Sequence, residues 1–330
     1  MNRKCSIIPF LLILWLTSGC QSRGEYSDFY FDYFDTFTSF TAYAEDEQTF
    51  QDYSGLVQSV LGTYHKLLDP YHAYDGLTNL YTLNQSAGQG PIKVSEKLFS
   101  FLQFSLDAYE ISRHSINIAL GPVTGLWREA IRSDSPSVPS RDALERAARY
   151  TDLSGLRLDP EQQTAELVSV GMVLDAGALA KGYAVSMAKE ALRSAGCTSA
   201  LLSAGGNILC IGSIPGLNGW NVGIQNPDTS SPNGLYTTWL VKDSCVVTSG
   251  DYERYFEVDG KRYHHIIDPA TLEPSTRYHS VTVRCADAAA ADLLSTALFI
   301  LPEEEGRQLA REYNAEVLYI YPDYTSSLVS

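Results

Sequence analysis

Two oxygen-bearing side chains near the C-terminus, Asp292 and Thr296, have a spacing that could serve a metal ion. They are four residues apart in a segment, Ala288 to Leu301, whose pattern predicts a helix. The carboxylate and the hydroxyl therefore project from one helix face. Hard divalent cations such as Mg²⁺ take oxygen ligands and often bind substrate phosphates as well. On spacing alone such a pair is more often an ordinary surface feature, so a metal site needs support from elsewhere in the chain.

A second candidate is the stretch from Asp175 to Gly212. An apolar strand over 171–174 is predicted to end at Asp175, and small residues then lead into a helix that has Lys181 and Gly182 in its first turns. Small residues in such a turn let backbone amides approach a ligand, and a helix N-terminus favours phosphate. An ordinary strand–helix connection, with its glycines placed for packing, explains this stretch equally well.

Later segments favour the phosphate interpretation. The chain carries T-S-G-D-Y from Thr248, H-H-I-I-D-P from His264 and A-D-L-L-S-T from Ala291. With D-A-G-A-L-A-K-G-Y-A from Asp175 and G-G-N from Gly205, in this order, the chain resembles the FAD:protein FMN transferases. These are the ApbE-type flavin transferases, also called the thiamine biosynthesis lipoprotein family. The resemblance begins near residue 34 and covers nearly the whole mature chain.

The resemblance implies roles for particular residues. Asp292, Thr296 and the backbone oxygen of Ala178 are expected to bind Mg²⁺, and alanine in place of the usual glycine is tolerable because a carbonyl is the ligand. Contacts to FAD are expected from Phe34, Tyr74, Ser115, Ile116, Asn117, Asp175, Lys181 and Ile267. The chain departs from the family pattern where Asp35 replaces a glycine, Asn117 an aspartate and Leu272 a turn glycine.

His265 is the histidine that the family pattern selects, and it is the candidate catalytic base. An imidazole whose pKa lies near neutrality can accept a proton from an attacking hydroxyl. Side chains alternate along a strand, so the adjacent His264 should point the opposite way. A histidine that only hydrogen-bonds the flavin or the backbone is the alternative.

The N-terminus resembles the signal peptide of a bacterial lipoprotein. Arg3 and Lys4 precede a short apolar run, and Thr17-Ser18-Gly19 lead to Cys20 as the lipidation site. The expected division is a signal peptide over 1–20, a tether over 21–33 and a transferase domain over 34–330. The protein is then exported and anchored in the cell envelope through lipid on Cys20. A plain secretory signal is the alternative.

The composition excludes some partners. The 330 residues carry a formal charge of −15, and removal of residues 1–20 leaves 22 basic and 39 acidic residues, a charge of −17. Such an acidic chain argues against nucleic-acid binding and against adhesion to anionic lipid through its overall charge. The four remaining cysteines, Cys197, Cys210, Cys245 and Cys285, lack metal-ligand spacing and are expected to be buried thiols, although one disulfide is compatible with export.

The expected fold is α+β, with mixed and antiparallel sheets and packed helices in one compact unit of intertwined lobes. Helices are predicted over 48–68, 95–112, 141–150 and 288–301, and strands over 34–44, 239–247, 252–258, 261–267 and 280–285. Two hairpins are predicted, one turning at Asp159-Pro160 and the other at Asp259-Gly260.

The expected activity is transfer of FMN from FAD, with Mg²⁺, onto a threonine or serine of an acceptor protein, with AMP released. The family implies an acceptor in a membrane electron-transfer complex. Two other functions remain open: an FAD pyrophosphatase, in which water replaces the hydroxyl, and a flavin-binding lipoprotein without activity.

Overall fold

The computed structural model describes residues 23–228, 230–231 and 234–330, and an eight-stranded sheet organises it. All neighbouring strands in this sheet are antiparallel. Their order is β1 (Gly24–Tyr33), β2 (Thr36–Ala44), β6 (Ala200–Ala204), β7 (Asn207–Ile211), β10 (Cys245–Gly250), β15 (Ser280–Cys285), β16 (Glu316–Ile320) and β17 (Ser326–Val329).

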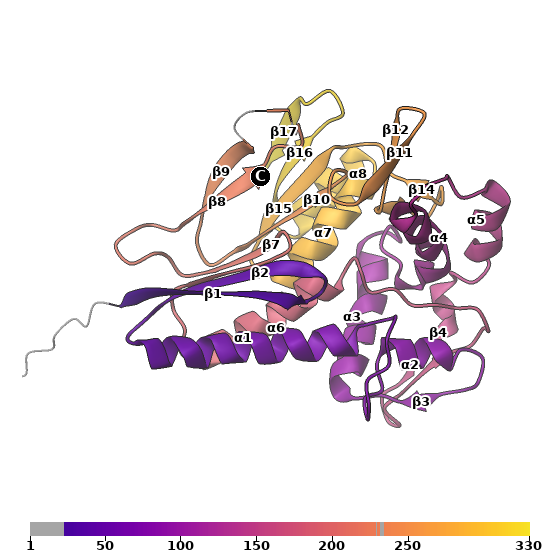
Figure 1. Cartoon of the computed structure of the whole chain (residues 1–330), viewed down its shortest axis with the longest axis horizontal. Coiled ribbons are helices and arrows are strands. Elements are labelled where there is room, and N and C mark those ends of the chain that lie inside the picture. Colours follow the sequence, from indigo (N-terminus) through magenta and orange to yellow (C-terminus); the bar gives the residue numbers. More distant parts are fainter. Residues whose placement is uncertain (1–22, 229, 232–233) are drawn as a thin grey trace, which may run out of the picture.

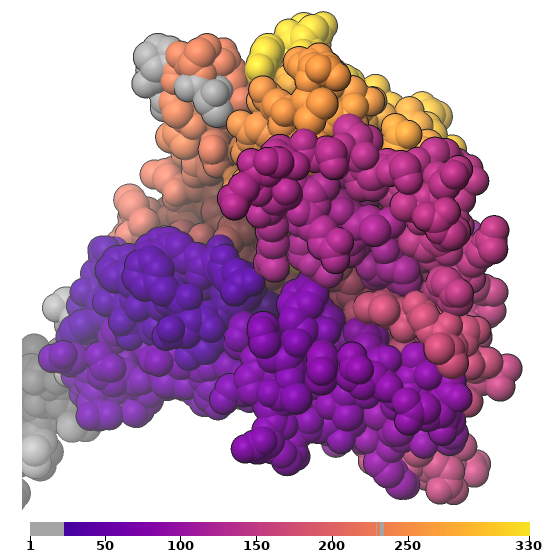
Figure 2. Space-filling model, turned by 45° about the vertical axis from the view of Figure 1, so that its right-hand side comes forward, coloured from indigo at the N-terminus to yellow at the C-terminus, as the bar shows by residue number. Residues whose placement is uncertain are grey.

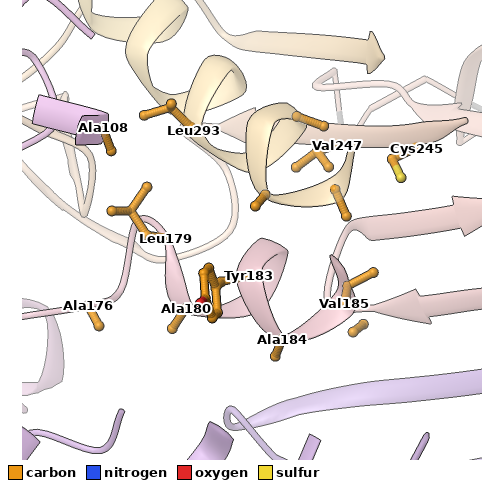
Figure 3. Close-up of a cluster of buried hydrophobic side chains, with 14 of the residues drawn as sticks. Ala108, Ala176, Leu179, Ala180, Tyr183, Ala184, Val185, Cys245, Val247 and Leu293 are labelled. Carbon is orange, nitrogen blue, oxygen red and sulfur yellow. The ribbon is translucent and has the colours of Figure 1, made fainter. Parts of the chain in front are cut away.

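Helices cover one face of this sheet (Figure 1). They are α1 (Glu47–Leu67), α6 (Ala180–Ser194), α7 (Ala288–Ile300) and α8 (Glu303–Glu312). Helix α1 buries residues at three- and four-residue spacing, including Phe50, Val57 and Leu61, whereas α7 is buried almost all round. Helices α6 and α7 pack on each other through small and branched side chains (Figure 3).

A hairpin of β8 (Trp220–Gln225) and β9 (Leu235–Val241) covers the opposite face. Trp220, Val222 and Val241 form a separate apolar cluster there with Cys210 and Val246 of the large sheet. The large sheet is therefore buried on both faces over its central strands.

A second, mainly helical lobe lies at one end of the sheet (Figure 1). It contains α2 (Leu80–Gln85), α3 (Glu96–Ile111), η1 (Ile118–Leu120), α4 (Gly121–Arg132), α5 (Arg141–Ala148), η2 (Leu153–Gly155) and the small sheet of β3 (Ile92–Lys93), β5 (Thr164–Leu167) and β4 (Leu156–Asp159). The hairpins β11 (Tyr255–Val258) with β12 (Lys261–His264), and β13 (Ile267–Asp268) with β14 (Glu273–Pro274), complete it.

The two lobes are intertwined, as the sequence predicted, because the chain leaves the second lobe for the large sheet and later returns to it. A small apolar cluster joins Trp127 of α4 and Leu144 of α5 to Phe256 and Ile267, which lie more than a hundred residues later. The fold is α+β with antiparallel sheets. The Ser95 cap of α3, the helix over 288–300 and both predicted hairpins are also confirmed.

Several predicted boundaries were wrong, and the strand predicted over 261–267, for example, ends at His264. The expected tether over 21–33 contains β1, since Gly24–Tyr33 pairs with β2, and the strand predicted from Phe34 begins at Thr36. Phe34 and Asp35 form the turn of this hairpin, with φ of 55° and 51°. The predicted strand over 239–247 is two strands, because the chain turns at Asp243 (φ 48°) and passes from β9 to β10.

The strand predicted over 171–174 does not form. Met172 and Leu174 are buried, but the backbone of Leu174 is paired with a side chain instead of a strand. Its N–H donates to Asn84 Oδ1 (2.7 Å), and its carbonyl accepts from Asn84 Nδ2 (2.9 Å). One buried amide therefore replaces a neighbouring strand immediately before Asp175.

The four cysteines in the described residues are buried free thiols. No helix in the described part of the chain is long and apolar enough to cross a membrane. The signal peptide predicted over 1–20, including Cys20, lies outside the described residues.

Candidate functional site

Asp292 is the most deeply buried carboxylate of the predicted site. It projects from α7 toward the first turn of α6 and is 4% exposed. Its Oδ2 accepts a hydrogen bond from the Gly182 N–H (2.8 Å), and its Oδ1 accepts one from Asn207 Nδ2 (3.4 Å). Burial raises the pKa of Asp292, while the nearby charge of Lys181 and these two donors oppose the rise. Asp292 forms no ion pair with a described residue, so a bound cation would stabilise its ionised form.

Gly182 is what allows α6 and α7 to approach at this point. A Cβ on residue 182 would lie 2.3 Å from Asp292 Cβ and 2.6 Å from the Ala288 carbonyl oxygen. Any side chain here would force the helices apart. The glycine therefore brings the Asp292 carboxylate to the backbone that begins α6.

Thr296 lies one turn beyond Asp292 on α7. Its hydroxyl is 3.1 Å from Ser249 Oγ at the end of β10. Ala178 lies in the turn that leads into α6. A carboxylate, a hydroxyl and a backbone carbonyl are hard oxygen donors of the type that Mg²⁺ takes, usually with waters or phosphate oxygens completing the shell.

No group of three or more His, Cys, Asp or Glu side chains that could hold a metal occurs in residues 23–228, 230–231 and 234–330. The predicted metal ligands are one carboxylate, one hydroxyl and one backbone carbonyl, so they do not form a group of three such side chains. The buried Oδ1 of Asn207, beside Asp292, has no hydrogen-bond partner among the residues that the structure describes. An orphaned oxygen next to an unpaired carboxylate fits a site for a cation with its waters.

His265 follows β12, and its ring is partly buried. Its Nδ1 is 3.3 Å from the carbonyl oxygen of Arg254. A carbonyl only accepts, so Nδ1 carries the proton and Nε2 retains its lone pair. Desolvation, together with the positive charges of Arg254 and Lys181, lowers the pKa of His265 to about 3. This shift lies below the near-neutral pKa expected from the sequence, and it favours the neutral ring, whose Nε2 can accept a proton.

His264 points away from this site, as strand alternation predicts. Its ring is buried against Phe299, with Nε2 donating to the Ser275 carbonyl (2.6 Å) and Nδ1 accepting from the Ile266 N–H (3.2 Å). Both ring nitrogens are engaged within the protein. His264 is a structural residue of the core.

Lys181 connects the two halves of the site electrostatically. Its charge acts on both the Asp292 carboxyl and the His265 ring. Lys181 therefore lies near both Asp292 and His265, with Thr296 one helical turn from Asp292 and Ala178 in the turn before α6. A positive side chain beside a cation site suits a pyrophosphate ligand.

Asp175 is held by the second lobe. Its Oδ2 accepts from Thr124 Oγ1 (2.9 Å) and pairs with Arg128 Nη1 (3.2 Å), and its Oδ1 accepts from the Gly177 N–H (2.9 Å). Arg128 also donates to the Tyr71 hydroxyl (2.6 Å) and lies 4.5 Å from the centre of that ring. The Asp175 carboxylate thus joins α4 to the turn before α6.

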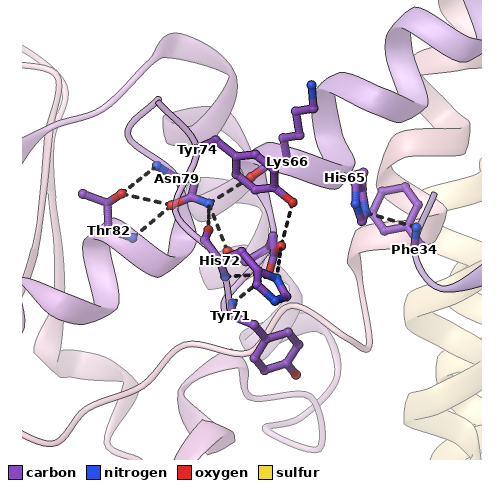
Figure 4. Close-up of polar contacts among 9 residues, drawn as sticks. Phe34, His65, Lys66, Tyr71, His72, Tyr74, Asn79 and Thr82 are labelled. Carbon is purple, nitrogen blue, oxygen red and sulfur yellow. Dashed lines mark hydrogen bonds and ion pairs between the residues drawn. The ribbon is translucent and has the colours of Figure 1, made fainter. Parts of the chain in front are cut away.

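The loop before α2 presents Tyr74 (Figure 4). The Tyr74 hydroxyl donates to Asp69 Oδ2 (2.8 Å), and burial with this carboxylate raises the pKa of Tyr74 to about 12. The buried Asn79 side chain fixes the loop, because it caps α2 and donates to the carbonyls of Lys66, Asp69 and His72. The aromatic ring is therefore held on a rigid loop.

Phe34 lies in the β1–β2 turn and contacts α1. Its N–H donates to His65 Nδ1 (3.1 Å), and the two rings meet edge to face at 5.6 Å (Figure 4). Asp35, which replaces the family's glycine, has a positive φ, so the turn forms without glycine. Figure 2 shows the surface hollowed where this indigo N-terminal region meets the magenta second lobe.

Ser115, Ile116 and Asn117 lie between α3 and η1, and their polar groups are engaged locally. Ser115 Oγ donates to the Ser112 carbonyl (2.8 Å), and the Ile116 N–H donates to Ser112 Oγ (3.0 Å). Asn117 Oδ1 caps η1 at the Ala119 N–H (2.8 Å), and its Nδ2 donates to the Thr151 carbonyl (2.8 Å). Ile267 is buried in the small apolar cluster beside Trp127. Contacts of these four residues with flavin stay predictions.

The sequence reasoning assigned no contact to several residues around the site. Asn84 supports the backbone before Asp175, Arg128 and Thr124 bind the Asp175 carboxylate, and Asn207 and Ser249 contact the expected metal ligands. Asn207 and Ser249 stand inside the quoted motifs G-G-N and T-S-G-D-Y, which is a usable signal. Arg128 and Thr124 share one face of α4 at i, i+4 spacing, but nothing in the sequence pairs them with Asp175.

Comparison with known proteins gives a consistent result. The model of the ApbE family matches residues 34–320. A protein of Treponema pallidum named FAD:protein FMN transferase is 38% identical over 260 residues, covering 74% of this chain and 71% of its own length. A protein of the same name from Klebsiella pneumoniae is 35% identical over 231 residues, covering 70% of each chain.

A solved structure has the same fold. The crystal structure of the ApbE protein from Thermotoga maritima superposes with a TM-score of 0.81 at 25% identity, over 93% of this chain and 97% of its own.

Proposed function

The chain belongs to the ApbE family, and on that premise we propose that it is an FAD:protein FMN transferase that modifies a threonine or serine hydroxyl of an acceptor protein. The assignment rests above all on Asp292. Asp292 is a buried carboxylate that pairs with no cationic side chain among the described residues, one helical turn from Thr296 and close to Lys181, and a bound cation would stabilise its ionised form.

Asp292, Thr296 and the Ala178 carbonyl would hold Mg²⁺ beside the pyrophosphate of FAD. When bound, the cation supplies positive charge that offsets the negative charge of the pyrophosphate. Lys181 adds a second positive charge from the first turn of α6. In a chain of net charge −15, this local positive charge is what permits binding of a dinucleotide.

His265 is proposed to remove the proton of the acceptor hydroxyl. Its Nδ1–H bond to the Arg254 carbonyl orients the ring and leaves Nε2 free to take that proton. The hydroxyl oxygen forms a bond to the phosphorus on the FMN side, the bond from that phosphorus to the bridging oxygen breaks, and AMP leaves with the bridging oxygen. Most of the rate enhancement is expected from positioning of the reactants and from neutralisation of the pyrophosphate charge, because the protein itself forms no covalent bond to the substrate.

Tyr74 is proposed to supply an aromatic face for a ring of FAD. Its hydroxyl is held by Asp69, and Asn79 fixes the loop, so the ring is ordered before the ligand binds. Such preorganisation reduces the entropy cost of binding. Phe34, in the β1–β2 turn, packs edge to face on His65 of α1 and is proposed as a further contact for FAD.

We further propose that the protein is exported and attached to the membrane through lipid on Cys20. This rests on the basic, apolar and small-residue segments that precede Cys20. The acceptor is then a protein exposed on the same side of that membrane, and a subunit of an electron-transfer complex is the class we propose.

One experiment separates the proposed transfer from the two alternatives. The full chain is incubated with FAD, Mg²⁺ and a candidate acceptor domain, and both the acceptor mass and the free nucleotides are measured. An acceptor carrying covalent FMN supports transfer. Free FMN with an unmodified acceptor indicates a pyrophosphatase, and unchanged FAD indicates binding without reaction.

A further inference from the structure

A cavity lies away from the candidate site, at the opposite end of α6. It has a volume of about 560 Å³ and opens to solvent. It is bordered by the last turn of α6, the residues just before β6, the residues just after β7 and the β9–β10 connection. Arg23, Arg193, Lys242 and Asp243 supply its charged groups, and Thr198 and Gly212 contribute to the wall.

The charges in this cavity are opposite in sign to those of the chain as a whole. Three cationic side chains face one carboxylate, although the full sequence has 24 basic and 39 acidic residues. Asp243 is already engaged, because Oδ1 accepts from the Gly212 N–H (2.8 Å) and from Arg193. Within the part of the chain that the structure describes, Lys242 takes part in no ion pair. The cavity therefore has an excess of positive charge available to a ligand.

Arg23 links this cavity to the N-terminus. Its guanidinium donates to the Thr198 hydroxyl, so the residue that precedes β1 is held at the cavity wall. Arg23 is three residues after Cys20, the proposed lipid attachment point. Whatever holds Cys20 therefore holds the cavity close to the same surface, since three residues span at most about 11 Å.

Helix α6 separates the cavity from the candidate site. Lys181 and Gly182 lie in its first turn and Arg193 in its last. Fifteen residues at about 1.5 Å each place the two regions about 20 Å apart. Figure 1 shows the chain entering β1 at the end of the sheet away from the second lobe.

We propose that this cavity binds the phosphate of an anionic phospholipid headgroup. The proposal rests on the proposed lipid attachment at Cys20, which would bring the cavity to the membrane surface. Arg23, Arg193 and Lys242 supply charge-assisted hydrogen bonds to the phosphate oxygens. Together with the anchor, this contact orients the protein so that the site at the start of α6 faces away from the membrane, toward an acceptor domain.

The test measures binding of three soluble probes to the full chain carrying Cys20→Ser in a non-ionic detergent. The probes are dihexanoylphosphatidylglycerol below its micelle concentration, dihexanoylphosphatidylcholine and inorganic phosphate, each titrated by calorimetry. The test variant is Arg193→Gln with Lys242→Gln. The control variant, Lys97→Gln with Arg146→Gln, makes the same change of charge at exposed positions outside the cavity.

We expect the phosphatidylglycerol probe to bind more tightly than the phosphatidylcholine probe. The affinity for the phosphatidylglycerol probe should fall at least tenfold in the cavity variant and less than twofold in the control variant. Equal loss in both variants would overturn the proposal, because it would indicate binding through overall charge. Inorganic phosphate binding as tightly as the lipid probe would overturn the lipid as the ligand.

Flavin transfer to a soluble acceptor, measured on the same samples, separates this proposal from the proposed function. The cavity variant should keep wild-type transfer while it loses lipid binding. Absence of transfer in the wild type would contradict the proposed function and leave the binding result standing.

Discussion

Replacement of Gly182 by alanine tests the contact on which the site is built. The added Cβ would lie 2.3 Å from Asp292 Cβ, whereas ordinary contacts lie at 3.4 Å or more, so α6 and α7 must separate by about 1 Å. Overpacking of this kind costs about 1–3 kcal/mol, and the helix propensity of alanine returns about 1 kcal/mol. The same movement lengthens the bond from the Gly182 N–H to Asp292.

The matched control is Gly55→Ala in α1. A Cβ at Gly55 meets nothing within 4 Å, so this variant keeps only the favourable propensity of about 1 kcal/mol. Urea unfolding followed by circular dichroism should therefore place Gly182→Ala about 1–3 kcal/mol below Gly55→Ala in free energy of unfolding. Flavin transfer by Gly182→Ala should also need more Mg²⁺ for half-maximal rate. Equal stability of the two variants, with an unchanged Mg²⁺ requirement, would refute the close contact between α6 and Asp292.

Four further predictions follow from individual residues. His265→Ala should slow transfer by about 10²–10⁴-fold and leave FAD binding nearly unchanged; an unchanged rate for the bound complex would place the base elsewhere. Because the pKa of His265 is lowered to about 3, its ring stays neutral as the pH falls from 8 to 5, and kcat/KM should show no loss from this group until the pH approaches 3. Tyr74→Ala should weaken FAD binding by about 1–3 kcal/mol by calorimetry, and a dissociation constant within twofold of wild type would exclude stacking. Cys20→Ser should move the protein out of the membrane fraction, and unchanged detergent partitioning would count against the lipid anchor.

The sequence predicted those parts of the fold that depend on local patterns. The Ser95 cap, the Asp259-Gly260 hairpin and the helix carrying Asp292 each have a signal within a few residues. The ordered motifs also identified residues that meet in space although more than a hundred residues separate them. Gly182 and Asp292 are an example, because the fold places the first turn of α6 against α7 and the Gly182 N–H donates to Asp292 Oδ2.

The remaining features depend on tertiary contacts that leave no local pattern. Strand β1 escaped prediction because aromatic residues occupy both of its faces: Tyr30 is buried, whereas Phe29 and Phe31 are 58% and 72% exposed. The segment over 171–174 is apolar, which favours a strand from the sequence. In the structure the distant side chain of Asn84 makes the hydrogen bonds to the Leu174 N–H and carbonyl that a neighbouring strand would make. The pKa of His265 depends on desolvation and on Arg254 and Lys181, which only the folded chain assembles.

The most direct test of the proposed function is the stoichiometry of one reaction. FAD and Mg²⁺ are incubated with the enzyme and an excess of acceptor, and AMP, free FMN and covalently bound FMN are quantified together over time. Transfer predicts one covalent FMN for each AMP released, and Asp292→Ala should abolish both. AMP matched by free FMN, with no covalent flavin on the acceptor, would contradict the proposed transfer.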